Sequence, residues 1–82
     1  MNGAYNCNDN FKEFRTWSKG YIKDDIDNAL ALNAVAIKYS RKKEYEKASK
    51  IYYCVYQNAV KQAHPTYIVA GLNNAAWYMQ VT

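Results

Sequence analysis

Residues 29–63, ALALNAVAIKYSRKKEYEKASKIYYCVYQNAVKQA, decide the fold of this chain. Small and apolar side chains recur there every three or four positions, which is the period of one face of an α-helix. The pattern predicts two amphipathic helices joined by a basic turn at 40–44. The residues expected on the two facing sides are Ala29, Leu32, Ala36 and Tyr39, then Tyr45, Ala48, Tyr52, Val55 and Ala59.

Small residues lie at the centre of both sets. Ala36 and Ala48 leave room for the two helix backbones to approach closely, while tyrosines fill the space beside them. A helical hairpin of this kind is the building unit of helical repeat proteins. The sequence therefore predicts an all-α fold.

The flanking segments add one helix on each side of the hairpin. Asn10 is expected to cap a short aromatic helix, with Glu13 completing a capping box and Gly20 ending the helix. Thr66 is expected to cap a last helix that reaches Met79 or beyond, after the His64–Pro65 pair has ended the hairpin. The side of this last helix expected to face inward carries Ile68, Leu72, Ala75, Ala76 and Met79.

Two stretches together resemble the tetratricopeptide repeat. The first is the spacing of Leu32, Ala36, Tyr39, Tyr45, Ala48 and Tyr52 in the hairpin. The second, HPTYIVAGLNNAAWYM at 64–79, is similar to the opening of the longer-period variety found in kinesin light chains. Leu32, Asn33 and Ala36 recur 40 positions later as Leu72, Asn73 and Ala76, within the period expected of helix-pair repeats.

The resemblance implies a domain order as well as a fold. Residues 1–23 would form a tail and an N-terminal capping helix, residues 24–63 a helix pair, and residues 64–82 the first helix of an incomplete second repeat. Lys43 departs from the family pattern, which has glycine near this position. If Lys43 adopts a positive φ angle, the cost is of order 1 kcal/mol.

The resemblance also implies a binding face. In the family, the first helix of each pair lines a concave surface, and its asparagines hydrogen-bond an extended peptide. Asn74 matches that asparagine, and an amide suits the task because it both donates and accepts. The side chains expected on this face are Asn33, Ile37, Arg41, Asn73, Asn74 and Trp77. The alternative is that the asparagines satisfy backbone groups between helices.

Catalytic and metal-binding patterns are missing from the sequence. The chain has one histidine, His64, with no nucleophile at motif spacing, and three glycines that form no phosphate-binding loop. The acidic group Asp24, Asp25 and Asp27 lacks the spacing of a calcium loop and is better explained as a helix start. We therefore expect neither an enzyme nor a cofactor.

Charge and cysteine content limit the possible partners and the cellular compartment of the protein. The net charge of +4 permits acidic partners, but the basic group Arg41, Lys42, Lys43, Lys47 and Lys50 is interspersed with glutamates, so nucleic acid is not expected. No apolar run reaches membrane length, and the two cysteines have no metal-like spacing. Together these features favour a cytoplasmic protein with reduced thiols.

We therefore expect a module that binds a peptide or another protein through this face. Two alternatives stay open. The first is an oligomerisation fragment, in which the apolar faces bury each other between chains. In either case we expect a homo-oligomer through the last helix, which lacks a partner helix. The second is the sensor part of a bacterial peptide-responsive transcriptional regulator without its DNA-binding domain, which rests on family analogy alone.

Overall fold

Four α-helices make up the described part of the chain in a computed structural model, which covers residues 7–18 and 28–80. They are α1 (Asn8–Trp17), α2 (Asn28–Arg41), α3 (Tyr45–Lys61) and α4 (Pro65–Gln80). Within these ranges there is no β-strand, so the prediction of an all-α fold of about four helices is confirmed. No helix in them is long and apolar enough to cross a membrane.

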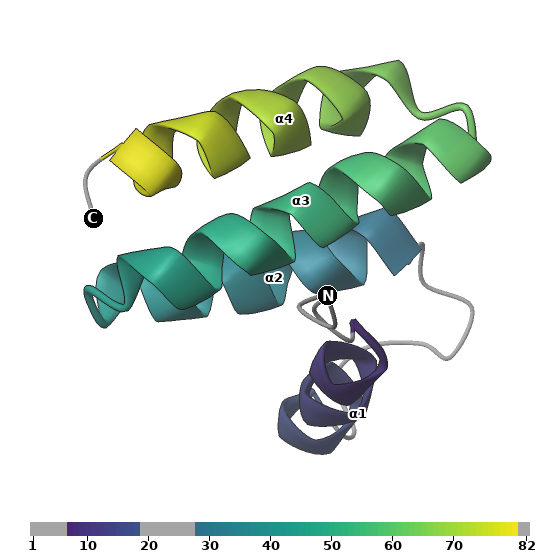
Figure 1. Cartoon of the computed structure of the whole chain (residues 1–82). Helices are drawn as coiled ribbons and strands as arrows, with labels where there is room; N and C mark the ends of the chain where they lie inside the picture. Colours follow the sequence, from purple (N-terminus) through teal and green to yellow (C-terminus); the bar gives the residue numbers. More distant parts are fainter. Residues whose placement is uncertain (1–6, 19–27, 81–82) are drawn as a thin grey trace, which may run out of the picture.

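The third helix is the centre of the arrangement (Figure 1). α3 packs against α2 and α4, and α1 packs against α2. α2 and α4 meet only along a short stretch. The hairpin of α2 and α3 is thus flanked by one helix on each side.

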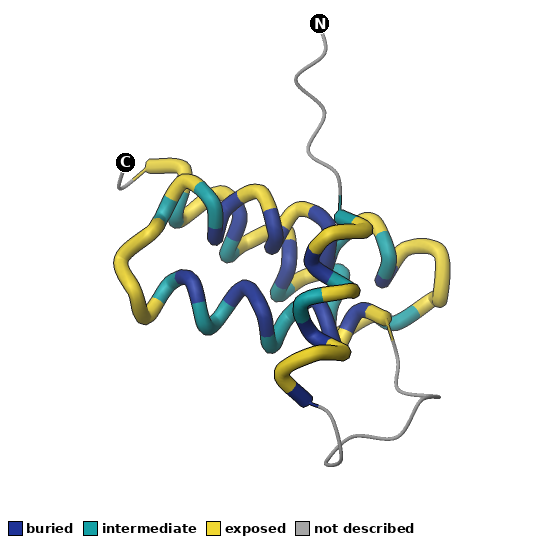
Figure 2. Tube along the Cα trace, turned by 90° about the horizontal axis from the view of Figure 1, so that it is seen from below, coloured by how far each residue is buried: buried dark blue, intermediate teal, exposed yellow. Residues whose placement is uncertain are grey.

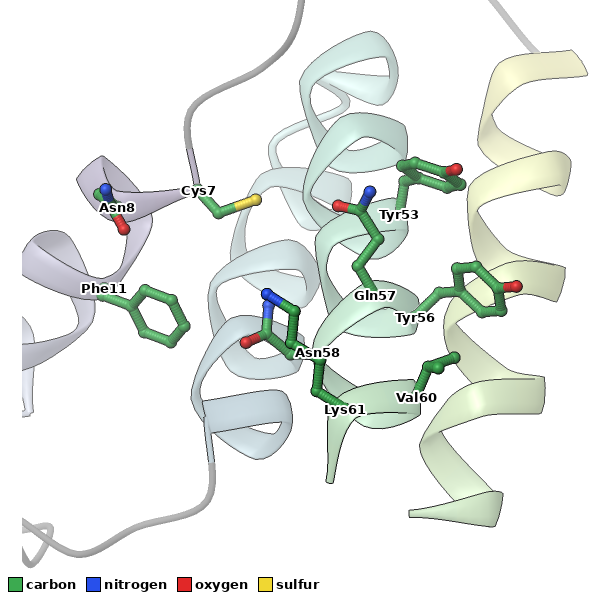
Figure 3. Close-up of a pocket in the computed structure, with 9 residues that line it drawn as sticks. All are labelled: Cys7, Asn8, Phe11, Tyr53, Tyr56, Gln57, Asn58, Val60 and Lys61. Atoms are coloured by element: carbon green, nitrogen blue, oxygen red, sulfur yellow. The ribbon is translucent and has the colours of Figure 1, made fainter. Parts of the chain in front are cut away.

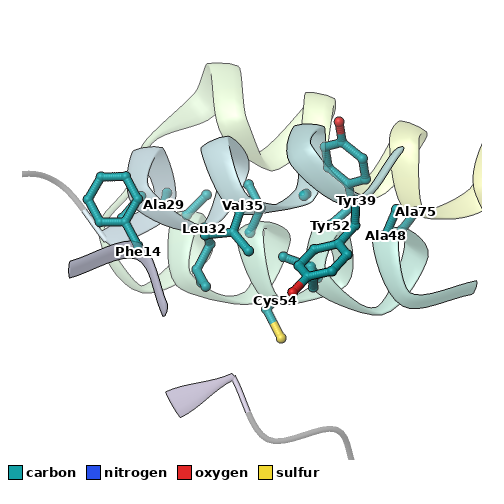
Figure 4. Close-up of a cluster of buried hydrophobic side chains, with 14 residues drawn as sticks. Phe14, Ala29, Leu32, Val35, Tyr39, Ala48, Tyr52, Cys54 and Ala75 are labelled. Atoms are coloured by element: carbon teal, nitrogen blue, oxygen red, sulfur yellow. The ribbon is translucent and has the colours of Figure 1, made fainter. Parts of the chain in front are cut away.

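The hydrophobic core is built mainly from α2 and α3, with Phe14 from α1 and Ala75 from α4 (Figure 4). Leu32, Val35, Ile51 and Val55 are completely buried, and side chains of this size contribute roughly 1.5–3 kcal/mol each when removed from water. Both predicted facing sets are buried except Tyr45, which is partly exposed. Figure 2 shows these buried positions recurring along the helices between exposed ones.

The ends of α2 and α3 share one geometry. Lys43 and Ala63 have positive φ angles of 64° and 53°. The residue after each of them donates its backbone N–H to a carbonyl of the preceding helix. Glu44 donates to Tyr39 in this way, and His64 donates to Ala59. This is the Schellman arrangement, which satisfies the last carbonyls of a helix. Lys43 thus adopts the positive φ angle whose cost was considered from the sequence, whereas no such angle was considered for Ala63.

Two predicted helix starts are wrong. α1 begins at Asn8, so Asn10 lies inside the helix, buried, instead of capping it. Glu13 does not close a capping box but bonds to α2, as described below. α4 begins at Pro65, ahead of Thr66, because proline fits the first helical position, where its missing N–H is not needed. The predicted helix stop at Gly20 and the acidic helix start at 24–27 lie outside the described residues.

The expectation of two reduced thiols is also wrong. Cys7, just before α1, forms a disulfide with Cys54 in the middle of α3, and their Cα atoms are 6.2 Å apart. That distance lies within the usual range for a disulfide. The bond ties the start of α1 to α3 across 47 positions of sequence, so α1 is held to the hairpin both covalently and by packing on α2.

Candidate functional site

The side of α2 that faces away from α3 is partly open. Of the predicted site residues on this helix, Asn33 and Ile37 are half-buried and Arg41 is exposed. Ile37 and Arg41 are four positions apart and therefore neighbours on one helix face. With Ala34 and Lys38 they border a hollow of about 470 Å³. The structure thus brings Ile37 and Arg41 into one depression, whereas Asn33 does not line it.

The other wall of this hollow comes from α1. Trp17 is 43% exposed and lines the depression beside Ala34 and Ile37. Its ring packs at 5.2 Å from the ring of Phe14, which is buried in the core. This helix was predicted only as a cap, so Trp17 was not among the predicted site residues. The three-residue step from Phe14 to Trp17 predicts that both rings lie on one side of α1, but not that α2 lies beside them.

An ion pair locks α1 to α2 at the edge of the hollow. The Nζ atom of Lys38 lies 2.6 Å from Oε2 of Glu13, and the Tyr39 hydroxyl donates to the same oxygen at 2.7 Å. Burial acts to raise the pKa of Glu13, but the hydrogen bonds from Lys38 and Tyr39 outweigh it and lower the pKa. The hydrogen bond to Glu13 likewise raises the pKa of Lys38.

The basic residues around the hairpin turn differ in what they contact. The ammonium groups of Lys38, Lys42 and Lys47 lie 4.2–5.4 Å from the centre of the Tyr39 ring, within cation–π range. The side chain of Arg41, in contrast, makes no hydrogen bond or ion pair with another residue of the described ranges. Its guanidinium is therefore the cation at this hollow with all five donors available to an anionic group.

The setting of α4 is fixed by close contact with α3. Gly71 and Ala75 are its buried residues, and a Cβ on Gly71 would lie 2.7 Å from the backbone nitrogen of Tyr56. The Ser49 hydroxyl donates to the Ala75 carbonyl at 2.9 Å. Tyr78 stacks on Tyr45 and on Tyr52, each with ring centres 5.6 Å apart.

This setting corrects the predicted inward side of α4. Ala75 is buried and Ile68 half-buried, but Leu72, Ala76 and Met79 are exposed. The physical reason is that α4 approaches α3 through its glycine and an alanine, which permit close backbone contact, instead of through its larger apolar side chains. The prediction used the large residues and so placed the contact on the wrong part of the helix.

The remaining predicted site residues lie on α4. Asn74 is half-buried, Asn73 is exposed, and Trp77 is 58% exposed. Asn74 and Trp77 are three positions apart and share a side of the helix, whereas Asn73 lies about 100° from Asn74. No hydrogen bond or ring contact joins these α4 residues to Asn33, Ile37 or Arg41 within the described ranges. The six residues therefore form two groups, one on each helix, and their common role stays a prediction.

A second depression, of about 500 Å³, lies between the start of α1 and α3 (Figure 3). No local sequence pattern indicated this depression, because its two walls are distant in sequence and are joined by the Cys7–Cys54 disulfide. Its walls are aromatic and amide side chains with one lysine: Cys7, Asn8, Phe11, Tyr53, Tyr56, Gln57, Asn58, Val60 and Lys61. Asn58 donates to the Cys54 carbonyl at 3.0 Å, so that amide group is engaged within α3.

Within the described ranges, no group of three or more histidine, cysteine, aspartate or glutamate side chains could hold a metal ion. A scan against protein-family models, a search of curated proteins and a search of solved structures each found no match.

Proposed function

We propose that this chain is a protein- or peptide-binding helical repeat module of the tetratricopeptide type, without catalytic activity. One observation carries the proposal. An apolar hollow of about 470 Å³, lined by Trp17, Ala34 and Ile37, opens next to Arg41, whose guanidinium has no partner among the described residues. An apolar depression with a few well-placed polar groups is the usual form of a binding site.

The chemistry of the hollow defines a class of ligand. Trp17 and Ile37 would take up an apolar side chain, and Arg41 would bind a carboxylate beside it in a bidentate manner. A hydrogen bond to a charged group contributes about 1.5–3 kcal/mol, and a neutral one about 0.5–1.5 kcal/mol. Arg41 should therefore contribute more to the affinity than either amide, Asn33 or Asn74, which would bind the peptide backbone.

Selection from a random peptide library displayed on phage tests the proposal without a known partner. We expect the selected peptides to combine an apolar residue with a neighbouring carboxylate, and to bind the protein in calorimetric titrations. Arg41→Ala should weaken their binding by about 10-fold to 150-fold, which corresponds to the charged hydrogen bond. Lys61→Ala, which removes an exposed cation outside the hollow, is the matched control and should leave the affinity unchanged.

Failure to enrich any peptide would contradict the proposal, as would equal affinities for wild-type protein and Arg41→Ala. Asn74→Ala answers a separate question. If its amide binds the peptide, affinity falls and the melting temperature holds. If the amide satisfies backbone groups between helices, its removal lowers stability first, because a stranded buried group costs about 1–3 kcal/mol.

The cytoplasmic location remains a prediction. It rested on the lack of an apolar run of membrane length in the sequence, and only the reduced thiols expected with it are wrong, because the structure joins Cys7 to Cys54. Disulfides persist chiefly in oxidising compartments and are common in small domains with limited cores. Thiol counting on protein isolated from its native cells under alkylating conditions tests the location. Two free thiols per chain would support the cytoplasm, and none would support an oxidising compartment.

A further inference from the structure

An exposed apolar strip runs along α4. Val69, Leu72 and Met79 are 59%, 46% and 66% exposed, and the exposed Ala76 lies between the last two. Their successive spacings of 3, 4 and 3 residues place all four on one side of the helix. We call Val69, Leu72, Ala76 and Met79 the α4 strip.

The α4 strip has the spacing of a coiled-coil seam. Apolar residues that alternate steps of three and four are the a and d positions of a heptad, which pack against an equivalent helix. The order 3, 4, 3 also reads the same in both directions. Two copies of α4 can therefore pack antiparallel with residue 74 of each copy at the same level. In that arrangement Val69 of one copy lies opposite Met79 of the other, and Leu72 lies opposite Ala76. In the second pair a large side chain meets a small one, which is how packed layers interdigitate.

Charge selects a second copy as the occupant of the strip. The chain has a net charge of +4, so most contacts between two copies bring like charges together. Among the four described helices, α4 is the one without charged residues in its sequence, PTYIVAGLNNAAWYMQ. Two copies can thus meet along α4 without opposing charges.

We propose that the protein forms a twofold-symmetric dimer through antiparallel contact of the α4 strip with its counterpart. The same surface patch is used on both chains, as a twofold interface requires. A helix of this length spans about 24 Å, so the interface is small and the dimer should form at micromolar concentration. This inference does not depend on Arg41 or the hollow beside it, because these lie on α1 and α2 and not on α4.

Charged variants of the strip provide the test. Leu72→Glu with Ala76→Glu makes the strip acidic, and Leu72→Lys with Ala76→Lys makes it basic. Thr66→Glu adds a carboxylate to an exposed position of α4 outside the strip and is the control. Sedimentation velocity across a hundredfold dilution, with circular dichroism to verify folding, gives the mass of each species.

We expect dimers for the wild type and for Thr66→Glu, and monomers for the acidic and basic variants. Like charges at the contact should raise the dissociation constant by about 100-fold or more. Mixing the acidic and basic variants should restore a dimer that contains one chain of each. A wild-type monomer at every concentration would overturn the proposal, as would dimers of the acidic variant alone.

The orientation has its own measurement. Nitroxide labels can be attached to Thr66→Cys while the native disulfide stays intact. In an antiparallel pair the two labelled positions should lie about 25 Å apart. This distance follows from a helix rise of about 1.5 Å per residue and a separation of about 8–10 Å between the helix axes. A parallel pair would hold the labelled positions at only the separation of the axes, about 10 Å. A short distance would therefore refute the antiparallel arrangement, even if a dimer forms.

Discussion

Gly71→Ala should destabilise the protein although alanine is the better helix former. The added Cβ would lie 2.7 Å from the backbone nitrogen of Tyr56 and 3.0 Å from the carbonyl oxygen of Tyr52. Both are backbone atoms of α3 and cannot rotate away, so α4 has to move outward. Overpacking of this kind costs about 1–3 kcal/mol, whereas the gain in helix propensity is only about 1 kcal/mol. We expect a net loss of up to about 2 kcal/mol.

Urea unfolding followed by circular dichroism measures this loss. The double variant Gly71→Ala with Ala76→Gly keeps the composition of α4 constant, so its propensity terms cancel and the overpacking cost remains. It should therefore be less stable than the single variant by about 1 kcal/mol. A Gly71→Ala midpoint equal to or above that of the wild type would show that α4 does not approach α3 through this glycine.

Three further predictions concern the core, the disulfide and the ion pair. Ala48→Leu should cost roughly 1–3 kcal/mol by overpacking the buried helix crossing, whereas the exposed Lys50→Leu should change little; equal urea midpoints would contradict the assigned faces. Cys7→Ser should cost about 2–5 kcal/mol by opening a long covalent loop, and a reductant should destabilise the wild type but not this variant. The lowered pKa of Glu13 means that its pairing with Lys38 stabilises the fold above the ordinary carboxyl pKa, and that this contribution is lost as the pH falls through the folded-state pKa. The stability difference between the wild type and Glu13→Gln should therefore be present at neutral pH and vanish in acid, and a difference independent of pH would refute the pairing.

Local patterns in the sequence predicted the hairpin well. The buried positions of α2 and α3 follow from a period of three and four residues, because one regular face of each helix meets the other. The positive φ angle of Lys43 could also be expected, since a helix that turns back sharply needs a left-handed residue at its end. Ala63 adopts the same conformation, but alanine carries no such signal, so only the tertiary turn reveals it.

Features that depend on distant parts of the chain could not be predicted. The Cys7–Cys54 bond spans 47 positions, and nothing in the local sequence of either cysteine indicates that α1 folds back onto α3. Trp17 was missed for the same reason, because its role at the hollow arises only when α1 lies beside α2. The local sequence of α1 predicted a capping box between Asn10 and Glu13. The Glu13 carboxylate instead accepts hydrogen bonds from Lys38 and Tyr39 of α2.

The rotation of α4 links both proposals. Close contact at Gly71 and Ala75 turns Leu72 and Met79 outward, where they form the α4 strip, while Asn74 stays half-buried. Leu72 and Asn74 are two residues apart and so point about 200° away from each other around the helix. The hollow is lined by α1 and α2 and by no residue of α4, so dimerisation through the strip would leave it open in both copies. Two such hollows in one particle would bind a ligand with two linked peptide segments more tightly than one hollow binds a single segment, because the second contact forms at a high effective concentration.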